Sequence, residues 1–380
     1  MRPRKPLPAY SESRRRMLAT LAGALALSAC GGGSGSGATP TPPAGGTPPR
    51  LRLSGPDILA PDGSPLKLRG WNWGRWGLAQ PTDAADNATQ GATCVRIPLR
   101  WWGYYEGVGI DSRDDSQTAT AGIDAGHLAI LDAMVAQASA AKLWIILFID
   151  SDCGQNGTQD AHEIGYCDPS GLYPNGHNFW TDAGARAKFI RVWKFIAARY
   201  KDTPYLGFFE PLPEPNPTSG TDADITAFYD EVMAAIRTVA PGVPFLLGPR
   251  VYGMKSVDLA YNAKWQDVVY TGNLFLRTSG THDENIAELG LRLQNLLDLQ
   301  SAHQVPIFVQ QCGVNSGDDP DLSYLNAMLT LLNTKGVGYT YWEYRDTLNS
   351  NAYGVIYQDG MGGWITKQGF LDTIAGYLKA

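Results

Sequence analysis

Residues 207–216 read Gly-Phe-Phe-Glu-Pro-Leu-Pro-Glu-Pro-Asn, an apolar run that gives way to alternating prolines and carboxylates. A short apolar run followed at once by turn residues is typical of a strand buried on both faces of a parallel sheet. The predicted strand covers Tyr205–Glu210 and ends at the Glu-Pro pair. It is the fourth of eight such runs along the chain.

The other runs alternate with segments of helical period, which is the pattern of strand–helix units around a parallel sheet. The predicted strands are Leu68–Trp73, Thr93–Leu99, Leu143–Asp150, Tyr205–Glu210, Pro244–Leu247, Asp267–Phe275, Pro306–Gln311 and Gly338–Trp342. This order predicts an α/β fold, the (β/α)8 TIM barrel, whose chemistry lies at the carboxyl ends of the strands. Two long connections, Gly103–Asp124 and Ser151–Asp182, are expected to overhang that end.

The segments between the strands carry apolar residues at helical spacing. Three such faces are Phe189, Trp193, Ile196 and Tyr200; Phe228, Val232 and Ile236; and Ile286, Leu289, Leu293 and Leu296. Residues three and four apart lie on one face of a helix, so each set is expected to pack against the barrel. We predict core packing for them and no cofactor site.

The N-terminal residues have the order of an export signal. Arg14–Arg16 precede an apolar run, Met17–Leu27, that is too short to span a membrane. The run ends at Leu27-Ser28-Ala29-Cys30, which resembles a lipobox, and the arginines resemble a twin-arginine signal. We predict a signal peptide at residues 1–29 and a lipid on Cys30. The arginine cluster argues against the alternative, a buried N-terminal helix.

The residues after Cys30 are almost entirely Gly, Ser, Thr, Ala and Pro up to Pro49. Such a segment has too little apolar surface to offset the entropy of ordering it, so residues 30–50 are predicted to form a flexible tether. Residues 51–380 contain no second linker and form one predicted domain, the barrel. We expect an exported protein anchored to a membrane of the bacterial cell envelope through Cys30.

Charge and cysteine content limit which ligands and cross-links the protein is expected to have. The net charge of −6 is mild and no basic stripe is present, so nucleic acid is not expected as a partner. Cys153 and Cys167 share one long loop and are able to pair in an oxidising compartment. Cys94 and Cys312 lie in apolar runs and are predicted to be buried thiols. The five histidines are scattered, and we predict no metal and no cofactor.

The Glu-Pro pair and four further motifs, in their order along the chain, resemble one family. The motifs are Leu68-Arg69-Gly70-Trp71-Asn72, Val95-Arg96-Ile97-Pro98, Pro306-Ile307-Phe308-Val309 and Tyr339-Thr340-Tyr341-Trp342. Together they are similar to the retaining glycoside hydrolases of family 5, the cellulase-like enzymes. The resemblance implies a carbohydrate-active protein that acts on β-linked polysaccharides or oligosaccharides. It gives Glu214 the place of the general acid/base, and Arg96 and Trp342 the places of sugar-binding residues.

Other positions depart from the family pattern. Gln311 occupies the place of the nucleophilic Glu at the end of the seventh strand. An amide is a poor nucleophile and brings no negative charge to an oxocarbenium-like transition state. Asp150 stands where the family places a His, and Pro213 replaces the Asn that hydrogen-bonds the 2-hydroxyl of the sugar. Asn273 and Phe275 stand at the places of a His and a Tyr that normally belong to the substrate site.

Three readings of this site remain open. The first is a hydrolase in which Glu214 is the acid and Asp150 the base of an inverting displacement. The second is a sugar-binding barrel without turnover, in which Trp342, Arg96, Asn273 and Gln311 hold a pyranose ring. The third uses another acid, such as Glu343, although alternation along a strand points it away from Trp342.

Two nearby charged residues have structural readings as well. Glu210 is expected to be an interior barrel residue paired with a basic side chain, and Arg96 is equally consistent with such a partner.

Overall fold

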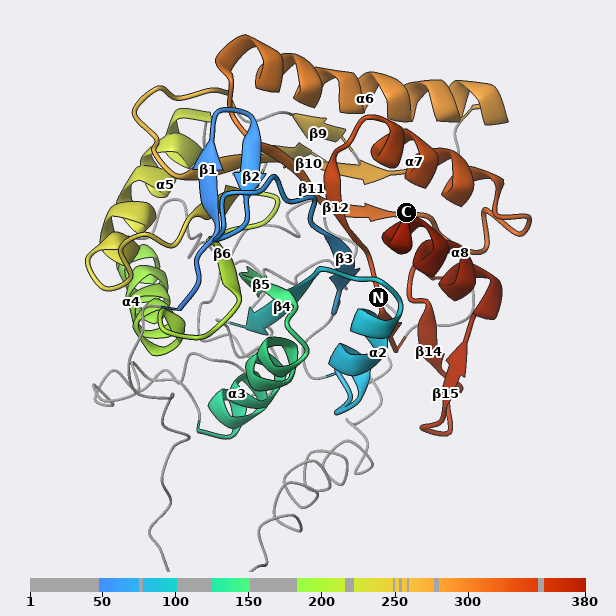
Figure 1. The fold of residues 1–380 in the computed structure, drawn as a ribbon, viewed down its shortest axis with the longest axis horizontal. Helices are drawn as coiled ribbons and strands as arrows, with labels where there is room; N and C mark the ends of the chain where they lie inside the picture. Colours follow the sequence, from blue (N-terminus) through green and yellow to red (C-terminus); the bar gives the residue numbers. More distant parts are fainter. Residues whose placement is uncertain are drawn as a thin grey trace, which may run out of the picture.

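Eight parallel strands close into a barrel in the computed structural model, which describes residues 48–74, 78–100, 125–150, 183–215, 222–248, 250–252, 255–257, 260–276, 280–347 and 352–380 (Figure 1). Around the barrel the strands are β3 (Arg69–Asn72), β4 (Cys94–Arg100), β5 (Trp144–Asp150), β6 (Leu206–Glu210), β7 (Phe245–Leu247), β10 (Val268–Phe275), β11 (Ile307–Gly313) and β12 (Gly338–Tyr341). The predicted (β/α)8 TIM barrel is confirmed, and each predicted strand overlaps an observed one.

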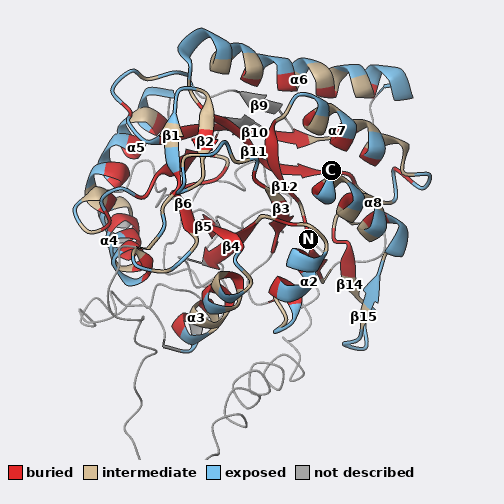
Figure 2. Ribbon diagram, in the orientation of Figure 1, coloured by how far each residue is buried: buried red, intermediate tan, exposed pale blue. Residues whose placement is uncertain are grey.

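A ring of helices surrounds the strands (Figure 1). They are α2 (Asp83–Thr89), α3 (Ala125–Ala140), α4 (Ala183–Tyr200), α5 (Asp222–Arg237), α6 (His282–His303), α7 (Ser323–Thr334) and α8 (Gln368–Lys379). Figure 2 shows the strands and the inward helix faces buried, and the outward faces exposed. Both surfaces of the sheet are therefore covered, which explains the continuous apolar reading of strands such as Trp-Ile-Ile-Leu-Phe-Ile-Asp in β5.

The predicted helix faces lie in the core. Phe189, Trp193 and Ile196 of α4 are fully buried, as is the predicted face of α5. On α6, Leu289, Leu293 and Leu296 are buried, whereas Ile286 is only partly buried. Because these side chains fill the layer between helices and strands, they explain how the ring is held to the barrel.

A small hairpin closes the amino end of the barrel. β1 (Arg52–Ser54) pairs antiparallel with β2 (Asp57–Leu59), and Leu51 and Ile58 join the interior cluster that contains Phe208 and Phe308. The sequence analysis did not predict this hairpin, because strands of three residues carry almost no periodic signal. With the amino end filled by apolar side chains, polar groups inside the barrel are confined to its carboxyl half.

Two further small sheets lie outside the barrel. One is the hairpin of β8 (Arg250–Tyr252) and β9 (Lys255–Val257). The other joins β13 (Arg345–Asp346), β14 (Ile356–Gln358) and β15 (Trp364–Thr366) after the last barrel strand. β13 is tied to α2 by a buried ion pair in which Arg345 Nε and Nη2 donate to the Asp83 carboxylate at 2.7 and 2.6 Å.

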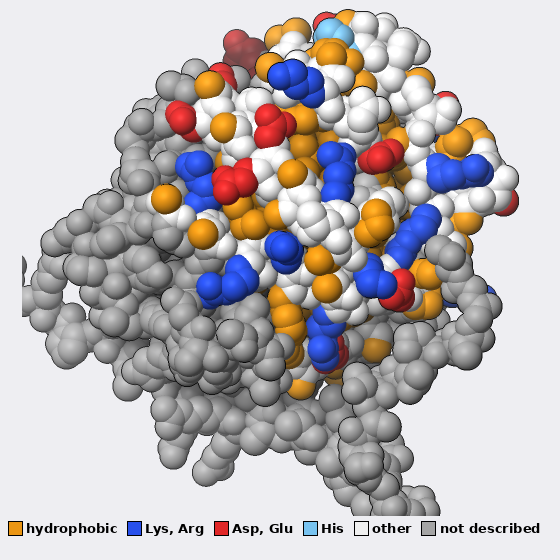
Figure 3. All heavy atoms as spheres, turned by 90° about the vertical axis from the view of Figure 1, so that its left-hand side faces the viewer, with side chains coloured by type: hydrophobic (Ala, Val, Ile, Leu, Met, Phe, Trp, Pro, Cys, Tyr) orange, Lys and Arg blue, Asp and Glu red, His pale blue; other side chains and the backbone are white. Residues whose placement is uncertain are grey.

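The outer surface of α4 and α5 carries basic, acidic and apolar side chains interspersed (Figure 3). Arg199 of α4 pairs with Asp132 of α3 at 2.5 Å, and Arg186 lies 4.0 Å from Glu231 of α5. These exposed pairs link neighbouring helices and contribute little stability each. Among the helices of the described residues, none combines the length and the apolar character that a membrane span requires.

Cys94 and Cys312 are buried free thiols, as predicted, and burial raises the pKa of both. Within the described residues no cluster of His, Cys, Asp or Glu is arranged to hold a metal ion. The predicted signal peptide and lipid site at Cys30, the predicted pair Cys153 and Cys167, and the connections 103–124 and 151–182 lie outside the described residues.

Candidate functional site

The polar part of the barrel interior contains an ion pair between β4 and β6. Arg96 on β4 donates through Nε and Nη2 to the two carboxylate oxygens of Glu210 on β6, both at 2.6 Å. The guanidinium also lies over the ring of Phe148, 3.4 Å from its centroid. Both charged residues are fully buried, and burial raises the pKa of Glu210 while Arg96 opposes that shift. The structural reading of Glu210 is therefore confirmed.

Glu214 lies four residues beyond the end of β6, in the loop of alternating prolines. Its backbone is in the left-handed region, with a φ of 50° that is uncommon for a residue other than glycine. Its Oε1 accepts a hydrogen bond from Asn273 Nδ2 on β10. The like charge of Glu214 also raises the pKa of Glu210.

Gln311 on β11 connects the ion pair to Glu214. In the orientation that satisfies both ends of its amide, Nε2 donates to Glu214 Oε1 at 3.1 Å and Oε1 accepts from Arg96 Nη1 at 3.1 Å. Arg96 thus donates through Nε and Nη2 to Glu210 and through Nη1 to Gln311. The structure brings Arg96, Glu214, Asn273 and Gln311 together, the residues that the resemblance to family 5 assigned to one site.

A bulge explains why two consecutive glutamines both face inward. The pairing of β11 with β12 runs Val309 with Tyr339 and then Cys312 with Tyr341, so β11 contains one extra residue. Gln310 follows the normal alternation and accepts from Thr271 Oγ1 inside the barrel at 2.7 Å. The extra residue breaks the alternation and turns Gln311 inward as well. Its direction therefore depends on the bulge and not on a simple period of two.

Two asparagines on the barrel wall offer polar atoms to a ligand. Asn72 at the end of β3 accepts from the Gly74 amide at 3.1 Å, which fixes its amide orientation and leaves Nδ2 without a partner among the described residues. Asn273 uses its Nδ2 for Glu214, and its Oδ1 likewise has no partner within the described residues. Both atoms are themselves buried, so each is a polar group whose desolvation a hydrogen bond would offset.

Partly exposed aromatic side chains lie at the carboxyl ends of β10 and β12 and in the segment that follows β12. Trp342, at the end of β12, is partly exposed, as are Phe275 and Tyr353. The rings of Phe275 and Tyr353 pack edge to face with centroids 5.4 Å apart. Gly313 lets them approach, because a Cβ at that position would lie 3.2 Å from the Tyr353 ring and 3.3 Å from the Phe275 ring. Partly exposed aromatic surface of this kind suits the apolar face of a sugar.

Comparison with known proteins fits this geometry. The sequence model of cellulase, glycosyl hydrolase family 5, matches residues 59–347. The chain belongs to glycosyl hydrolase family 5. Family 5 membership makes it a carbohydrate-active, hydrolase-like protein. No curated protein matches the chain by sequence.

Several solved structures share the fold. Cel5A from Thermotoga maritima, solved with mannotriose, is 18% identical with a TM-score of 0.60, over 81% of this chain and 97% of that chain. The β-glucanase SdGluc5_26A from Saccharophagus degradans is 15% identical with a TM-score of 0.61, over 88% and 95%. The cellulose synthase subunit CcsZ from Clostridioides difficile is 18% identical with a TM-score of 0.58, over 83% and 100%. At these identities the likeness establishes the fold alone.

The remaining predicted positions are distributed around the mouth of the barrel. Pro213 is buried in the loop that carries Glu214. The backbone of Asp150 ends β5, the strand next to β6, and its side chain is outside the described part of the structure. Glu343 is fully buried, and its Oε2 occupies the space beside Gly74, 1.8 Å from where a Cβ there would be. Its carboxyl is therefore packed into the wall beside β3 and not open to solvent.

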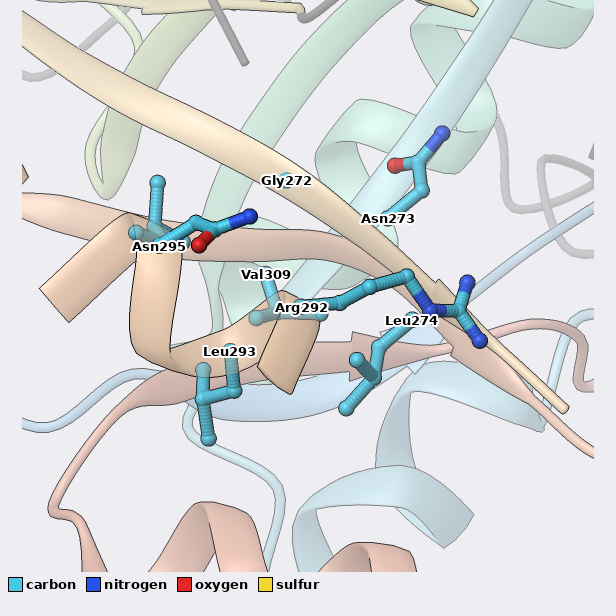
Figure 4. A pocket seen from close by; sticks show the side chains of 8 residues that line it. Gly272, Asn273, Leu274, Arg292, Leu293, Asn295 and Val309 are labelled. Atoms are coloured by element: carbon cyan, nitrogen blue, oxygen red, sulfur yellow. The ribbon is translucent and has the colours of Figure 1, made fainter. Parts of the chain in front are cut away.

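A small pocket lies elsewhere, on the outer side of the barrel between β10 and α6 (Figure 4). Arg292 and Leu293 line it from the helix, and the side chain of Asn273 points away from them. Because Asn273 bonds Glu214 on the inner side of the same strand, this pocket is separate from the site.

Sequence reasoning missed Asn72 and Tyr353 as site residues. Asn72 belongs to a motif that was recognised for the fold, and its place at a strand end was the signal available. Tyr353 follows the last barrel strand in a segment without periodic pattern, so its contact with Phe275 depends on tertiary structure alone.

Proposed function

We propose that this barrel binds a β-linked glycan at the carboxyl end of its strands and does not carry out the retaining double displacement. The amide of Gln311, which stands in the nucleophile's place with one end on Arg96 and the other on Glu214, is the observation that carries the proposal. Retention needs two carboxyls about 5 Å apart, one as acid/base and one as nucleophile. Here the second group is an amide, which cannot form the covalent intermediate.

The ligand contacts of this proposal come from the partly exposed Glu214, the unpaired asparagine atoms and the aromatic surface. Asn72 Nδ2 donates to a sugar oxygen, and Asn273 Oδ1 accepts from a sugar hydroxyl. Trp342 and the pair of Phe275 and Tyr353 cover the apolar faces of pyranose rings. Arg96 is fully buried and bonded to Glu210, so it supports the ligand through Gln311.

Hydrolysis by a route other than retention is the second candidate. It is favoured by the left-handed backbone at Glu214, since uncommon conformations of this kind concentrate at functional sites. In an inverting mechanism Glu214 is the acid and a base faces it across the sugar, with carboxyls roughly 6.5–9.5 Å apart. The backbone of Asp150 lies on the strand adjacent to β6, which does not favour a position across the mouth.

A panel of β-glucan, β-mannan and β-xylan oligosaccharides tests both candidates, with binding measured by calorimetry and cleavage by release of reducing ends. The parent is expected to bind at least one glycan without cleaving it, and Glu214→Gln to weaken that binding. A Gln311→Glu variant tests the retaining geometry, with Gln266→Glu at an exposed position in the loop before β10 as the control for added charge.

Cleavage by the parent that Glu214→Gln abolishes would refute a binding-only role and establish the second candidate. Binding to no glycan in the panel would refute the proposal itself. If Gln311→Glu alone gains reducing-end release, the site is a retaining one in which the nucleophile has been replaced.

We further propose that the protein is a lipoprotein of the bacterial cell envelope, with signal residues 1–29, a lipid on Cys30 and a tether at residues 30–50. The arginine cluster, the apolar run and the small residues before Cys30 support this. Labelling with radioactive palmitate is expected to mark the parent and not Cys30→Ser, and the parent is expected in the membrane fraction. Equal labelling of both proteins would refute lipid attachment at Cys30.

A further inference from the structure

We propose that Trp193, Tyr229 and Gly248 position Glu214 by clamping the proline loop that carries it. The inference rests on the proposed function only in taking Glu214 as the central ligand-binding group. All three residues lie outside the polar interior: Trp193 on α4, Tyr229 on α5 and Gly248 just after β7. None of them faces the mouth of the barrel, since the two aromatic residues are fully buried among helices and strands.

The loop cannot hold its own shape through regular backbone hydrogen bonds. Residues 211, 213 and 215 are prolines, so Leu212 and Glu214 supply the only backbone N–H groups between β6 and Pro215. Glu214 also adopts a positive φ immediately before a proline, where the chain prefers extended backbone. Such a conformation persists only where surrounding contacts determine it.

Two side chains from the outer helices supply those contacts. Trp193 Nε1 donates to the carbonyl of Pro211 at 3.0 Å. The Tyr229 hydroxyl lies 2.9 Å from the carbonyl oxygen of Leu212 and 3.0 Å from that of Gly248, and donates to this pair. The hydroxyl therefore ties the loop after β6 to the end of β7. Burial raises the pKa of Tyr229 well above its ordinary value, so the hydroxyl keeps its proton.

Gly248 completes the clamp by permitting close contact. A Cβ at this position would lie 2.8 Å from the Leu212 carbonyl oxygen, 3.0 Å from the Glu214 nitrogen and 3.2 Å from the Pro213 Cα. All three are backbone atoms, which cannot rotate away as the end of a flexible side chain can. Any larger residue at position 248 must push the loop outward and with it Glu214.

The clamp matters because the partners of Glu214 are short side chains on other strands. Asn273 and Gln311 each reach Oε1 from a fixed strand position, and the Gln311 hydrogen bond already measures 3.1 Å, so a loop shift of about 1 Å breaks it. Side chains of the outer helices therefore hold the loop that carries Glu214, whereas its hydrogen-bond partners Asn273 and Gln311 are held by barrel strands.

Two substitutions test the clamp from opposite sides in the full-length protein. Tyr229→Phe removes the donor and keeps the ring, while Gly248→Ala adds a methyl group against the loop. Tyr200→Phe is the matched control, because that hydroxyl bonds Asp132 on α3. Gly336→Ala, in the turn between α7 and β12, is the second control, because its φ of 66° makes alanine costly while its nearest contact is the end of the Lys67 side chain at 3.8 Å. The readout is the carboxyl ¹³C resonance of Glu214, assigned with Glu214→Gln, together with the affinity for cellohexaose.

The Glu214 resonance is expected to move in Tyr229→Phe and Gly248→Ala and to stay in both controls, although every variant loses some stability. Affinity for cellohexaose is expected to fall roughly tenfold in the two test variants, the effect of one hydrogen bond. An unmoved resonance in both test variants, or the same movement in the controls, overturns the clamp. If the resonance moves as expected and the parent does not bind cellohexaose, the clamp stands and the glucan form of the proposed function fails.

Discussion

Arg96 and Arg345 make the same chemical contact in two different parts of the molecule. Each donates through Nε and Nη2 to both oxygens of one buried carboxylate, Arg96 to Glu210 and Arg345 to Asp83, at distances of 2.6–2.7 Å. Inside the barrel, Arg96 has a third nitrogen that continues to Gln311 and so to Glu214. Outside the barrel, the Asp83 carboxylate accepts one further hydrogen bond, from the backbone amide of Gln80 at 2.7 Å, beside the start of α2.

The difference is one of surroundings and not of bond geometry. The outer pair joins α2 to β13 and lies beside aromatic rings, with Arg345 Cζ 4.7 Å from the Trp364 ring centroid. The inner pair lies beneath a polar site and holds the orientation of an amide within it. A buried ion pair is by itself weak evidence for a gain in stability. Its role is therefore inferred from the contacts of the nitrogen and oxygen atoms that the pair leaves over.

Breaking the inner pair is expected to have the largest effect. Arg96→Met leaves the fully buried Glu210 carboxylate without its partner and lets Gln311 turn, so we expect a loss of about 3–5 kcal/mol in unfolding free energy. Glycan binding should be lost as well. Urea denaturation and calorimetry measure the two effects separately.

The double variant Arg96→Met with Glu210→Leu is the control for that prediction. Replacing both charges with apolar groups should recover most of the stability, because no isolated charge remains, but not the glycan binding. If binding returns together with stability, Arg96 serves the fold alone, and the distinction between the two pairs disappears.

Breaking the outer pair is expected to cost less. In Arg345→Met the Asp83 carboxylate keeps the hydrogen bond from the Gln80 amide, so we expect a loss of about 2–3 kcal/mol in unfolding free energy. Glycan affinity should match the parent's within error, because this pair joins α2 to β13 outside the barrel. A clear loss of affinity in a folded Arg345→Met protein would contradict the separation of the two regions.

The two pairs also differ in how far sequence could reveal them. Arg96 and Glu210 each stand within a predicted strand, and the barrel brings strands into a known order, so their pairing was one of the readings considered. Asp83 and Arg345 are 262 positions apart, and neither belongs to a predicted strand. Their meeting depends on the course of the chain after β12, which no local pattern encodes.

The same limit applies within the site. Glu214 and Gln311 were found because strand ends and motif order locate them, and Asn273 followed from the sixth barrel strand. The inward turn of Gln311 needed a bulge, and the clamp needed side chains of α4 and α5 that had been assigned to core packing. Trp193 was correctly predicted as buried, but a period of 3.6 cannot show where an indole N–H points.

A negative charge added at position 311 tests how strongly the inner ion pair is coupled to Glu214. Gln311→Glu places a carboxylate between that of Glu214 and Nη1 of Arg96. Because the single charge of Arg96 already pairs with Glu210, three carboxylates would share one cation, and the repulsion is expected to raise the pKa of Glu214 and of the introduced carboxyl in the folded state. We expect about 1–2 kcal/mol less unfolding free energy than the parent at pH 7. A raised folded pKa means that this deficit is present above it and shrinks as the pH falls through it.

Urea denaturation of Gln311→Glu and the parent at pH 7 and pH 5 measures that difference. Gln266→Glu, at an exposed position in the loop before β10, is the control, and its difference from the parent should be near zero at both values. A Gln311→Glu deficit that does not change with pH would mean that the new carboxyl turns away from Glu214.

The smallest effect is expected at Lys367, a partly buried cation outside the barrel without a bidentate carboxylate. Its Nζ donates to the Ala352 carbonyl at 2.6 Å, and Asp346 and Glu343 favour its charge from nearby. Burial outweighs them and lowers its pKa from 10.5 to about 8. The contrast with Arg345 is that a lysine can respond to poor solvation by losing its proton, whereas an arginine keeps its charge.

The sign of the pH effect at Lys367 follows from that shift. Between about pH 8 and 10.5 the unfolded chain holds a proton that the folded one has released, so stability rises with pH in this window. Relative to Lys367→Met, the parent should gain on the order of 1 kcal/mol between pH 7 and pH 10, since solvent screens a side chain that is only partly buried. Thermal or urea unfolding of both proteins measures the difference, in which the titration of the tyrosines cancels. A constant difference across this range would show that the ammonium is fully solvated, and that a cation on this side of the molecule needs no bidentate carboxylate to remain charged.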